Sequence, residues 1–432
     1  MQPRRITRRS AIAASVATAI MPIRALAARQ SAHAYRAIRY ARAERFSPAV
    51  LEPFRESLIQ KERGPIAPQL PGGLSISIGP QSPNRQQEDC QVLSVFTPSR
   101  HGHRPVVIFL HGGGFATGGG ELSWYDGHRL AAEQDVVVVP VTYRLGALGF
   151  WLPNGSSGLS PAYSDMVTSL QWVQKYIDQF GGDPANVTLA GQSAGCCAAM
   201  ELTDLGFGGK LYQRVIAMSG GRVSGTREEA EERSRVFDRI LGMDPHTAPV
   251  EVMRNAYARL PRSSPVLGDR RPFWLPVASD KRAPINIDVM AGWAREDYAA
   301  HVLLAEGRKP IPGTSLQSFR DATRPMREEL TAYARDAAAA GQKAYLYSFD
   351  WNGPDTGLGN CHCIDLAFLY GDWEAWKNAP MLAGVNRREY ERMGHRMRAQ
   401  WATFARSGRP TIPDGGKWAP VTTAEAPVAS LS

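Results

Sequence analysis

The hydrophobic pattern along the chain predicts a set of buried β-strands. Four short segments are almost continuously apolar rather than alternating: Val106–Leu110, Val136–Val141, Val187–Ala190 and Val215–Met218. Such runs are typical of strands that are covered on both faces. Polar residues interrupt two weaker candidates, which are Ile285–Met290 and Ala344–Phe349.

Helical patterns lie between these strands. Residues 164–180 carry apolar side chains at helical spacing and end at a pair of glycines, and a helix also fits Ala194–Leu205, Arg327–Ala340 and Arg388–Arg406. Strands that alternate with helices predict an α/β fold with a mostly parallel sheet and helices on both faces. No Pro/Gly/Ser-rich linker divides the chain, so we expect residues 28–432 to form a single domain.

The first 27 residues have the order of an export signal. A basic start that ends in Thr7–Ser10 precedes the apolar segment Ala11–Met21, and Ala25–Ala27 supplies the small residues that a signal peptidase needs. The paired arginines indicate the twin-arginine type of signal. We expect an exported, periplasmic or secreted protein. An ordinary secretion signal and an uncleaved anchor are the alternatives, and the shortness of the apolar segment argues against the anchor.

Composition and charge exclude several classes of protein. The chain of 432 residues is 43% hydrophobic and 21% charged, which is typical of a globular protein. Five arginines in residues 1–27 supply more than half of the formal charge of +9, so we expect no nucleic-acid partner. No apolar run reaches about 18 residues, so we expect no stable membrane span.

The five cysteines do not form the pattern of a disulfide framework, because their number is odd and four of them are clustered. Cys361 and Cys363 flank His362, but this spacing is not that of a zinc site. We therefore expect no metal and no cofactor.

The sharpest local motif is Gly191–Gly195, which has the form G-x-S-x-G. It follows a predicted strand and precedes a predicted helix, as a nucleophile elbow requires, and it makes Ser193 a candidate nucleophile. A glycine-rich turn, His111–Phe115, follows an earlier strand. The backbone N–H groups of Gly113, Gly114 and Ala194 are candidates to bind the oxyanion that forms during acyl transfer.

These motifs belong to a wider resemblance, which runs from about Tyr40 to Pro420. The chain resembles the type-B carboxylesterases, the α/β-hydrolase family that includes para-nitrobenzyl esterases and cholinesterases. The most specific shared segments are Glu88–Cys90, His111–Phe115, Val141–Gly146, Gln171–Gln174 and Phe180–Pro184. The resemblance implies an α/β-hydrolase fold and a serine carboxylesterase that forms an acyl-enzyme from a small ester. It also implies buried ion pairs between Arg45 and Glu88 and between Arg144 and Asp165.

A serine hydroxyl needs a base, and this fold supplies one late in the chain, after the acid. Three histidines lie late enough, and the resemblance favours His362, which lies in a loop after the strand Ala344–Phe349. We expect His395 and His301 to lie on helix surfaces. The resemblance places the acid after a strand that ends in Gly292, which makes Asp297 the candidate and Glu296 the alternative.

The chain also departs from the family. Gln192 stands where the family has glutamate, and Cys90 lacks its usual partner, so we expect a free thiol there. Cys196 and Cys197 should lie near Cys361 and Cys363, either as free thiols or as a cross-link. Shorter segments on either side of Asp297 predict shortened helical walls and a more open site.

Two other functions remain open from the sequence. The same triad chemistry would serve amide or lactone hydrolysis, and some members of this fold only bind partners.

Overall fold

In the computed structural model, the described residues are 31–260, 273–277, 282–412, 416 and 418–432. Within this part of the chain, nine strands form one sheet in the order β1-β4-β6-β5-β7-β8-β9-β10-β11. Strands β2 and β3 form a separate antiparallel pair. The bounds of the strands are β1 His33–Arg39, β2 Ala41–Arg42, β3 Val50–Leu51, β4 Val92–Thr97, β5 Arg104–Leu110, β6 Val137–Val141, β7 Gly182–Gln192, β8 Arg214–Met218, β9 Asp288–Ala294, β10 Ala344–Phe349 and β11 Val428–Leu431.

The centre of the sheet is parallel, as the sequence predicts. Strand β4 pairs antiparallel with both β1 and β6, and every other neighbouring pair in the large sheet is parallel. Because parallel strands point the same way, the carboxyl ends of β5, β7, β8 and β9 meet at one edge. This edge is where an open α/β sheet places its site.

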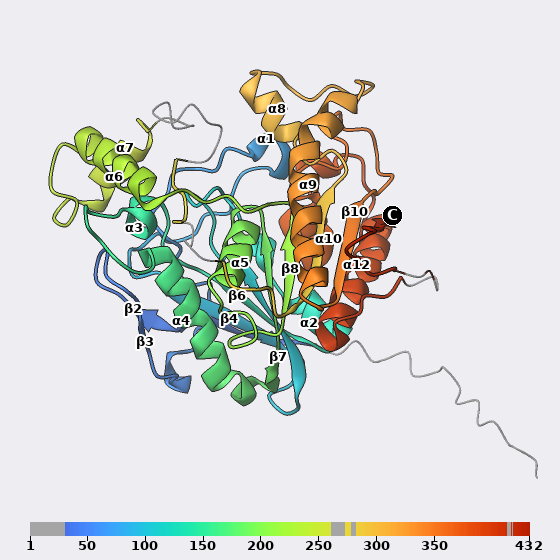
Figure 1. Cartoon of the computed structure of the whole chain (residues 1–432), viewed down its shortest axis with the longest axis horizontal. Coiled ribbons are helices and arrows are strands. Elements are labelled where there is room, and N and C mark those ends of the chain that lie inside the picture. Colours follow the sequence, from blue (N-terminus) through green and yellow to red (C-terminus); the bar gives the residue numbers. More distant parts are fainter. Residues whose placement is uncertain (1–30, 261–272, 278–281, 413–415, 417) are drawn as a thin grey trace, which may run out of the picture.

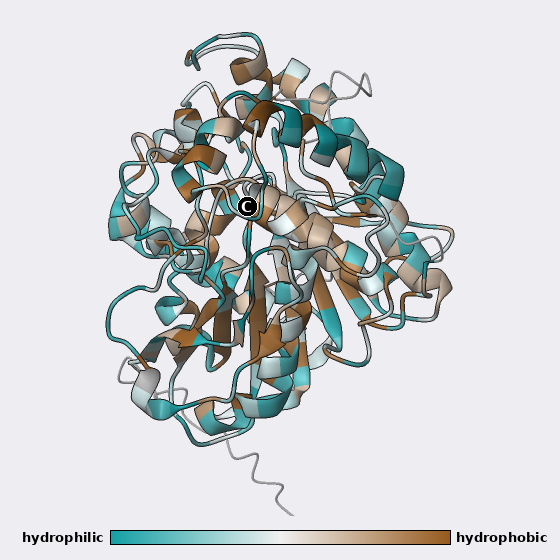
Figure 2. Ribbon diagram, turned by 90° about the vertical axis from the view of Figure 1, so that its left-hand side faces the viewer, coloured by the Kyte–Doolittle hydropathy of each residue, from teal (hydrophilic) through white to brown (hydrophobic). Residues whose placement is uncertain are grey.

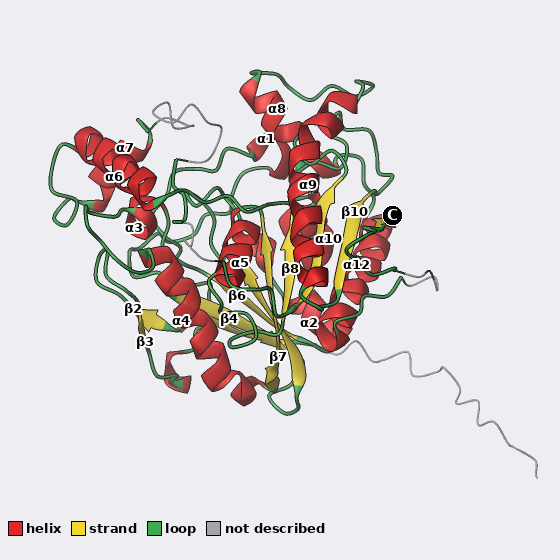
Figure 3. Cartoon of the chain, in the orientation of Figure 1, coloured by secondary structure: helices red, strands yellow, loops and turns green. Residues whose placement is uncertain are grey.

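The helices cover both faces of the sheet (Figures 1 and 3). Their bounds are α1 Ser75–Ile78, α2 His128–Gln134, α3 Gly146–Phe150, α4 Pro161–Tyr176, α5 Ala194–Asp204, α6 Arg227–Leu241, α7 Val250–Tyr257, α8 Ala299–Ala305, α9 Gln317–Ala339, α10 Ile364–Tyr370, α11 Trp373–Trp376 and α12 Arg387–Ser407. In Figure 1, α6, α7 and α8 lie toward the top of the view, beyond the strands.

Two apolar cores lie on opposite faces of the sheet. Along β5, Ile108 and Leu110 pack into one core with residues of α4, α5 and α9. Phe109 lies between them in sequence and packs into the other core, with residues of α2, α10 and α12. Figure 2 shows brown, hydrophobic strands beneath helices that carry teal, hydrophilic surfaces. Burial on both faces explains why the central strands read as continuous apolar runs.

Several predicted boundaries are wrong: β7 begins at Gly182 rather than Val187, the helix predicted for residues 164–180 is α4, and β9 and α9 are also displaced. Strand β9 begins at Asp288 and continues through Gly292 to Ala294, because it pairs with β8 and β10 over this length. Gly292 is required inside the strand, since a Cβ there would lie 2.3 Å from the Tyr347 ring. Helix α9 starts ten residues before the predicted Arg327 and contains a proline. Its early turns are held by buried side chains such as Phe319.

The ion pairs implied by the resemblance are both present, but only the second is buried, because Arg45 and Glu88 are partly exposed. Arg45 Nε donates to Glu88 Oε2 at 2.8 Å, and its NH2 group contacts the other oxygen. Arg144 makes two 2.8 Å bonds to the carboxylate of Asp165, and both side chains are almost fully buried. The second pair fixes the chain after β6 to α4.

We expect Arg144→Ala to lower the free energy of unfolding by about 3–5 kcal/mol, because the Asp165 carboxylate would stay buried without its partner. Chemical denaturation measures this loss. Arg235→Ala is the matched control, since Arg235 makes a more exposed pair with Glu232 and should cost at most about 1 kcal/mol. Equal effects of the two variants would contradict a buried, structural role for Arg144.

The predicted signal of residues 1–27 lies outside the described residues. Among the helices that the structure describes, none is long and apolar enough to cross a membrane.

Candidate active site

Ser193 lies at the sharp turn between β7 and α5. Its backbone has φ 56° and ψ −124°, a strained conformation for a residue with a side chain. The neighbouring glycines allow the turn to close: a Cβ on Gly191 would lie 2.1 Å from the oxygen of Gly195, and one on Gly195 would lie 2.0 Å from the oxygen of Leu110. The turn places a partly exposed serine at the N-terminus of α5, where the helix dipole favours negative charge.

Asp297 lies three residues beyond the end of β9 and is fully buried. Its Oδ1 is 2.5 Å from Nδ1 of His362. Its Oδ2 accepts hydrogen bonds from the Ser219 hydroxyl at 2.6 Å and from the Ala294 N–H at 2.9 Å. Burial would raise the pKa of Asp297, but His362 and these donors hold it below its usual value. The carboxylate is therefore ionised and fixed in direction.

Sequence reasoning missed Ser219. It lies directly after β8 with φ 52°, and its backbone N–H donates to the Gly292 oxygen on β9. Its position at the carboxyl end of a strand, beside the strand of the nucleophile, is the signal that would have identified it.

His362 belongs to the loop between β10 and α10. Its backbone N–H donates to the backbone carbonyl of Asp297 at 3.0 Å. In return, the backbone N–H of Glu296 donates to the backbone carbonyl of Asn360, also at 3.0 Å. Two short backbone bonds thus join the loop of the candidate acid to the loop of the candidate base. The aspartate and the histidine are oriented by the backbone as well as by their side chains.

Glu296, the alternative acid, is directed elsewhere. Its Oε1 accepts from Arg295 at 2.9 Å and from Arg320 at 2.7 Å, and its Oε2 accepts from the Asn360 N–H at 2.9 Å. The structure therefore brings Asp297, and not Glu296, to His362. Glu296 ties α9 and the histidine loop to the end of β9.

The glycine-rich turn lies directly against the nucleophile. A Cβ on Gly112 would lie 2.9 Å from the Cβ of Ser193, so only glycine fits there. Gly113 and Gly114 have positive φ and are partly exposed, and the space beside Gly114 is open. The Tyr143 hydroxyl donates to the His111 oxygen at 2.6 Å and fixes the start of the turn. These contacts place the start of the turn, at Gly112, against Ser193, and Gly113 and Gly114 follow it directly.

The other two late histidines differ in their surroundings. His395 is exposed on α12 and pairs with Glu133, as expected of a surface residue. His301 is exposed on α8, but its ring lies 4.9 Å from that of His362, edge to face. The prediction of a plain surface position for His301 was therefore incomplete.

All five cysteines are free and buried in this structure. Cys196 contacts Met200 and Cys361 contacts Met381, sulfur to sulfur, instead of each other. Burial raises the pKa of Cys197 to about 11, so its thiol is protonated at neutral pH. Within the described residues, no three His, Cys, Asp or Glu side chains are grouped to hold a metal ion.

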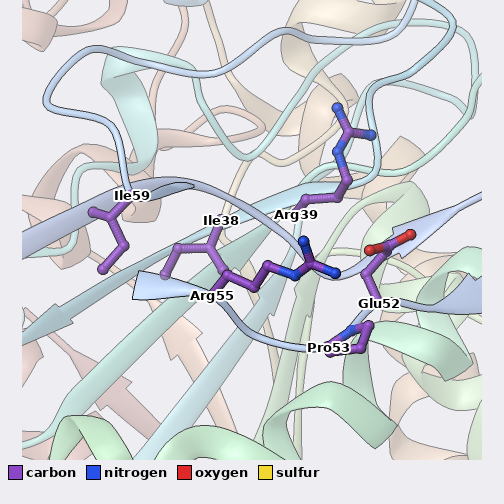
Figure 4. Close-up of a pocket in the computed structure, with 6 residues that line it drawn as sticks. All are labelled: Ile38, Arg39, Glu52, Pro53, Arg55 and Ile59. Carbon is purple, nitrogen blue, oxygen red and sulfur yellow. The ribbon is translucent and has the colours of Figure 1, made fainter. Parts of the chain in front are cut away.

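Two cavities in the described part of the chain are lined by residues other than Ser193 and His362. Figure 4 shows one of about 10 Å³, near the first strands, which has room for about one water molecule. Its lining residues are Ile38, Arg39, Glu52, Pro53, Arg55 and Ile59. Another, of about 180 Å³, lies beside Phe46 and Trp151. The candidate site is therefore identified from the contacts among Ser193, His362 and Asp297 and their neighbours, and not from a cavity.

A family model described as the carboxylesterase family matches residues 23–261 and 315–432. The chain is 33% identical over 408 residues to a probable N-octanoylanthranilate hydrolase of Rhodococcus erythropolis, covering 88% of this chain and 90% of that protein. It is 28% identical to the para-nitrobenzyl esterase of Bacillus subtilis, covering 84% and 83%.

Among solved structures, a PNB esterase superposes with a TM-score of 0.74 at 25% identity, and the match covers 93% of this chain and 92% of that chain. The expected α/β-hydrolase fold is confirmed.

Proposed function

The chain belongs to the carboxylesterase family and hydrolyses carboxylic esters, and from this premise we propose that Ser193, His362 and Asp297 carry the reaction. The observation that carries the proposal is the Asp297–His362 contact of 2.5 Å, held by the Ser219 hydroxyl and the Ala294 N–H. A buried carboxylate that fixes an imidazole beside a strained serine is the arrangement of a serine hydrolase.

In this mechanism the Ser193 hydroxyl attacks the ester carbonyl, and Nε2 of His362 takes its proton. Asp297 keeps the other ring proton on Nδ1 and stabilises the charged ring. The N–H groups of Gly113, Gly114 and Ala194 bind the oxyanion. His362 then protonates the leaving alcohol, and a water molecule that it activates releases the acid from Ser193. The small ester itself is the only reactant besides water.

Labelling with a fluorophosphonate probe tests this assignment. We expect one label per chain, on Ser193 by peptide mass spectrometry, and none after Ser193→Ala. A label on another serine, or none on the native chain, would favour a different nucleophile or a member of the fold that only binds its partner.

Amide hydrolysis is a second candidate, because the relative at 33% identity is named for an N-acyl substrate. The same acyl-enzyme would form from an N-acyl compound, with an amine as leaving group. Comparing kcat/KM for para-nitrophenyl octanoate and N-octanoylanthranilate ranks the two activities. Turnover of the ester alone would exclude the anthranilate.

We also propose that residues 1–27 export the protein through a twin-arginine signal. The support is the order of basic, apolar and small residues in this segment. In a bacterial host, the native chain should reach the periplasm with a new N-terminus near Ala28. Replacement of Arg8 and Arg9 by lysine should leave the uncut chain in the cytoplasm, and unchanged export would contradict the twin-arginine type.

A further inference from the structure

Gln192 contacts the nitrogen of His362 that has to act as the base. It is the last residue of β7 and is 1% exposed. Its side-chain Nε2 lies 3.1 Å from Nε2 of the His362 ring. Within the described part of the chain, the Ser193 hydroxyl has no hydrogen-bond partner. In the free protein, Nε2 of His362 is therefore hydrogen-bonded to Gln192 and not to Ser193.

The neighbours of the two His362 ring nitrogens decide whether the nitrogen or the oxygen of the Gln192 amide faces Nε2. Asp297 accepts from Nδ1 of His362, so the neutral ring has its lone pair on Nε2. Only the amide N–H₂ of Gln192 can donate to that lone pair, because the amide oxygen would oppose it with another acceptor. The packing agrees, since the Gln192 Oε1 lies beside Gly112, where a Cβ would come within 2.7 Å.

We propose that Gln192 is a positioning residue that stabilises the neutral, proton-accepting form of His362 and yields Nε2 to Ser193 when substrate binds. This inference rests on the proposed function, in which His362 takes the proton of Ser193. An N–H₂ group cannot accept a hydrogen bond from the protonated ring, so its contact favours the neutral ring. A carboxylate in the same place would favour the charged ring instead.

The consequence is a wider active range toward acid. A base works only while it is unprotonated, so kcat/KM falls where His362 takes up a proton. With Gln192 in place, this fall should come at a lower pH than with a glutamate of the same shape. Gln192 thus sets the acid limit of the enzyme.

Several other groups face His362, and each has to be separated from this effect. Asp297 faces Nδ1, His301 faces the ring from α8, and Cys363 is adjacent in its own loop. Although the His301 side chain is exposed overall, desolvation of its ring and the neighbouring His362 lower its pKa to about 4, below the range of the test. Burial raises the pKa of the Cys363 thiol. Asp365 on α10 requires a control, because burial and Asp297 raise its pKa to about 7.

The test is the pH dependence of kcat/KM for para-nitrophenyl acetate between about pH 5 and pH 9 in the native chain and in Gln192→Glu. We expect the midpoint of the acid limb to rise by about one pH unit in the variant. The shift stays at the lower end of the usual range because the new carboxylate would be buried near Asp297. Gln192→Met, which has similar length and no donor, should move the midpoint in the same direction by less.

The Asp365→Asn background removes the titration of Asp365. In that background, Gln192→Glu should raise the midpoint of the acid limb by the same amount. An unchanged midpoint, or a uniform loss at every pH, would overturn the proposal, because a purely structural residue would behave so. If Gln192→Glu does not fold, the midpoint of Gln192→Met decides in the same way. Failure of the proposed function is distinguishable, since the native chain would then carry no label on Ser193.

Discussion

Ser193→Ala should lower kcat by about 10⁴–10⁶-fold, and His362→Ala should lower it by a similar factor. The first variant removes the atom that forms the acyl-enzyme, and the second removes the base that activates it. The two losses should not add, because nucleophile and base act as a unit. Steady-state kinetics with para-nitrophenyl acetate measure the two single variants and the variant that combines both substitutions.

A second buried serine provides the control for this experiment. Ser169 on α4 is fully buried and donates to the Met166 backbone oxygen of the same helix at 2.7 Å. Ser169→Ala should leave kcat within about threefold, because it touches no reacting group. Retention of more than a tenth of native activity in Ser193→Ala or His362→Ala would refute the assigned mechanism.

Asp297→Asn should lower kcat by about 10³–10⁴-fold at neutral pH. The amide keeps the size of the side chain but no longer holds the proton on Nδ1 of His362, so the ring loses both its orientation and the stabilisation of its charged form. Circular dichroism and denaturation check that the variant is folded.

Glu296→Gln is the matched comparison, because it makes the same chemical change one residue earlier. It leaves Arg320 without its carboxylate and weakens the bond to the Asn360 N–H, but it does not touch His362. We expect kcat within about tenfold of native and a lower stability. If the ranking of the two variants were reversed, Glu296 would be the acid, and the geometry described above would not be that of the working enzyme.

The sequence by itself predicted the class of fold, which is confirmed, and a candidate nucleophile. Strands buried on both faces have to be apolar at every position, which is why β5 and β8 could be identified from local pattern alone. The motif around Ser193 is also local in sequence, although only the need for Gly191 is local: a Cβ there would meet Gly195, whereas one on Gly195 would meet Leu110 on β5. The strand β9 starts three residues and ends four residues later than predicted, since its ends depend on pairing with β8 and β10 rather than on its own composition.

Only the tertiary structure distinguished the candidate acid from its neighbour. Asp297 and Glu296 are adjacent in sequence and equal in charge, and what separates them is the direction that the loop after β9 gives each side chain. The supporting hydroxyl of Ser219 and the contact between Gln192 and His362 join segments that are far apart in the chain. The local sequence pattern does not predict such contacts, because they form where the carboxyl ends of separate strands meet.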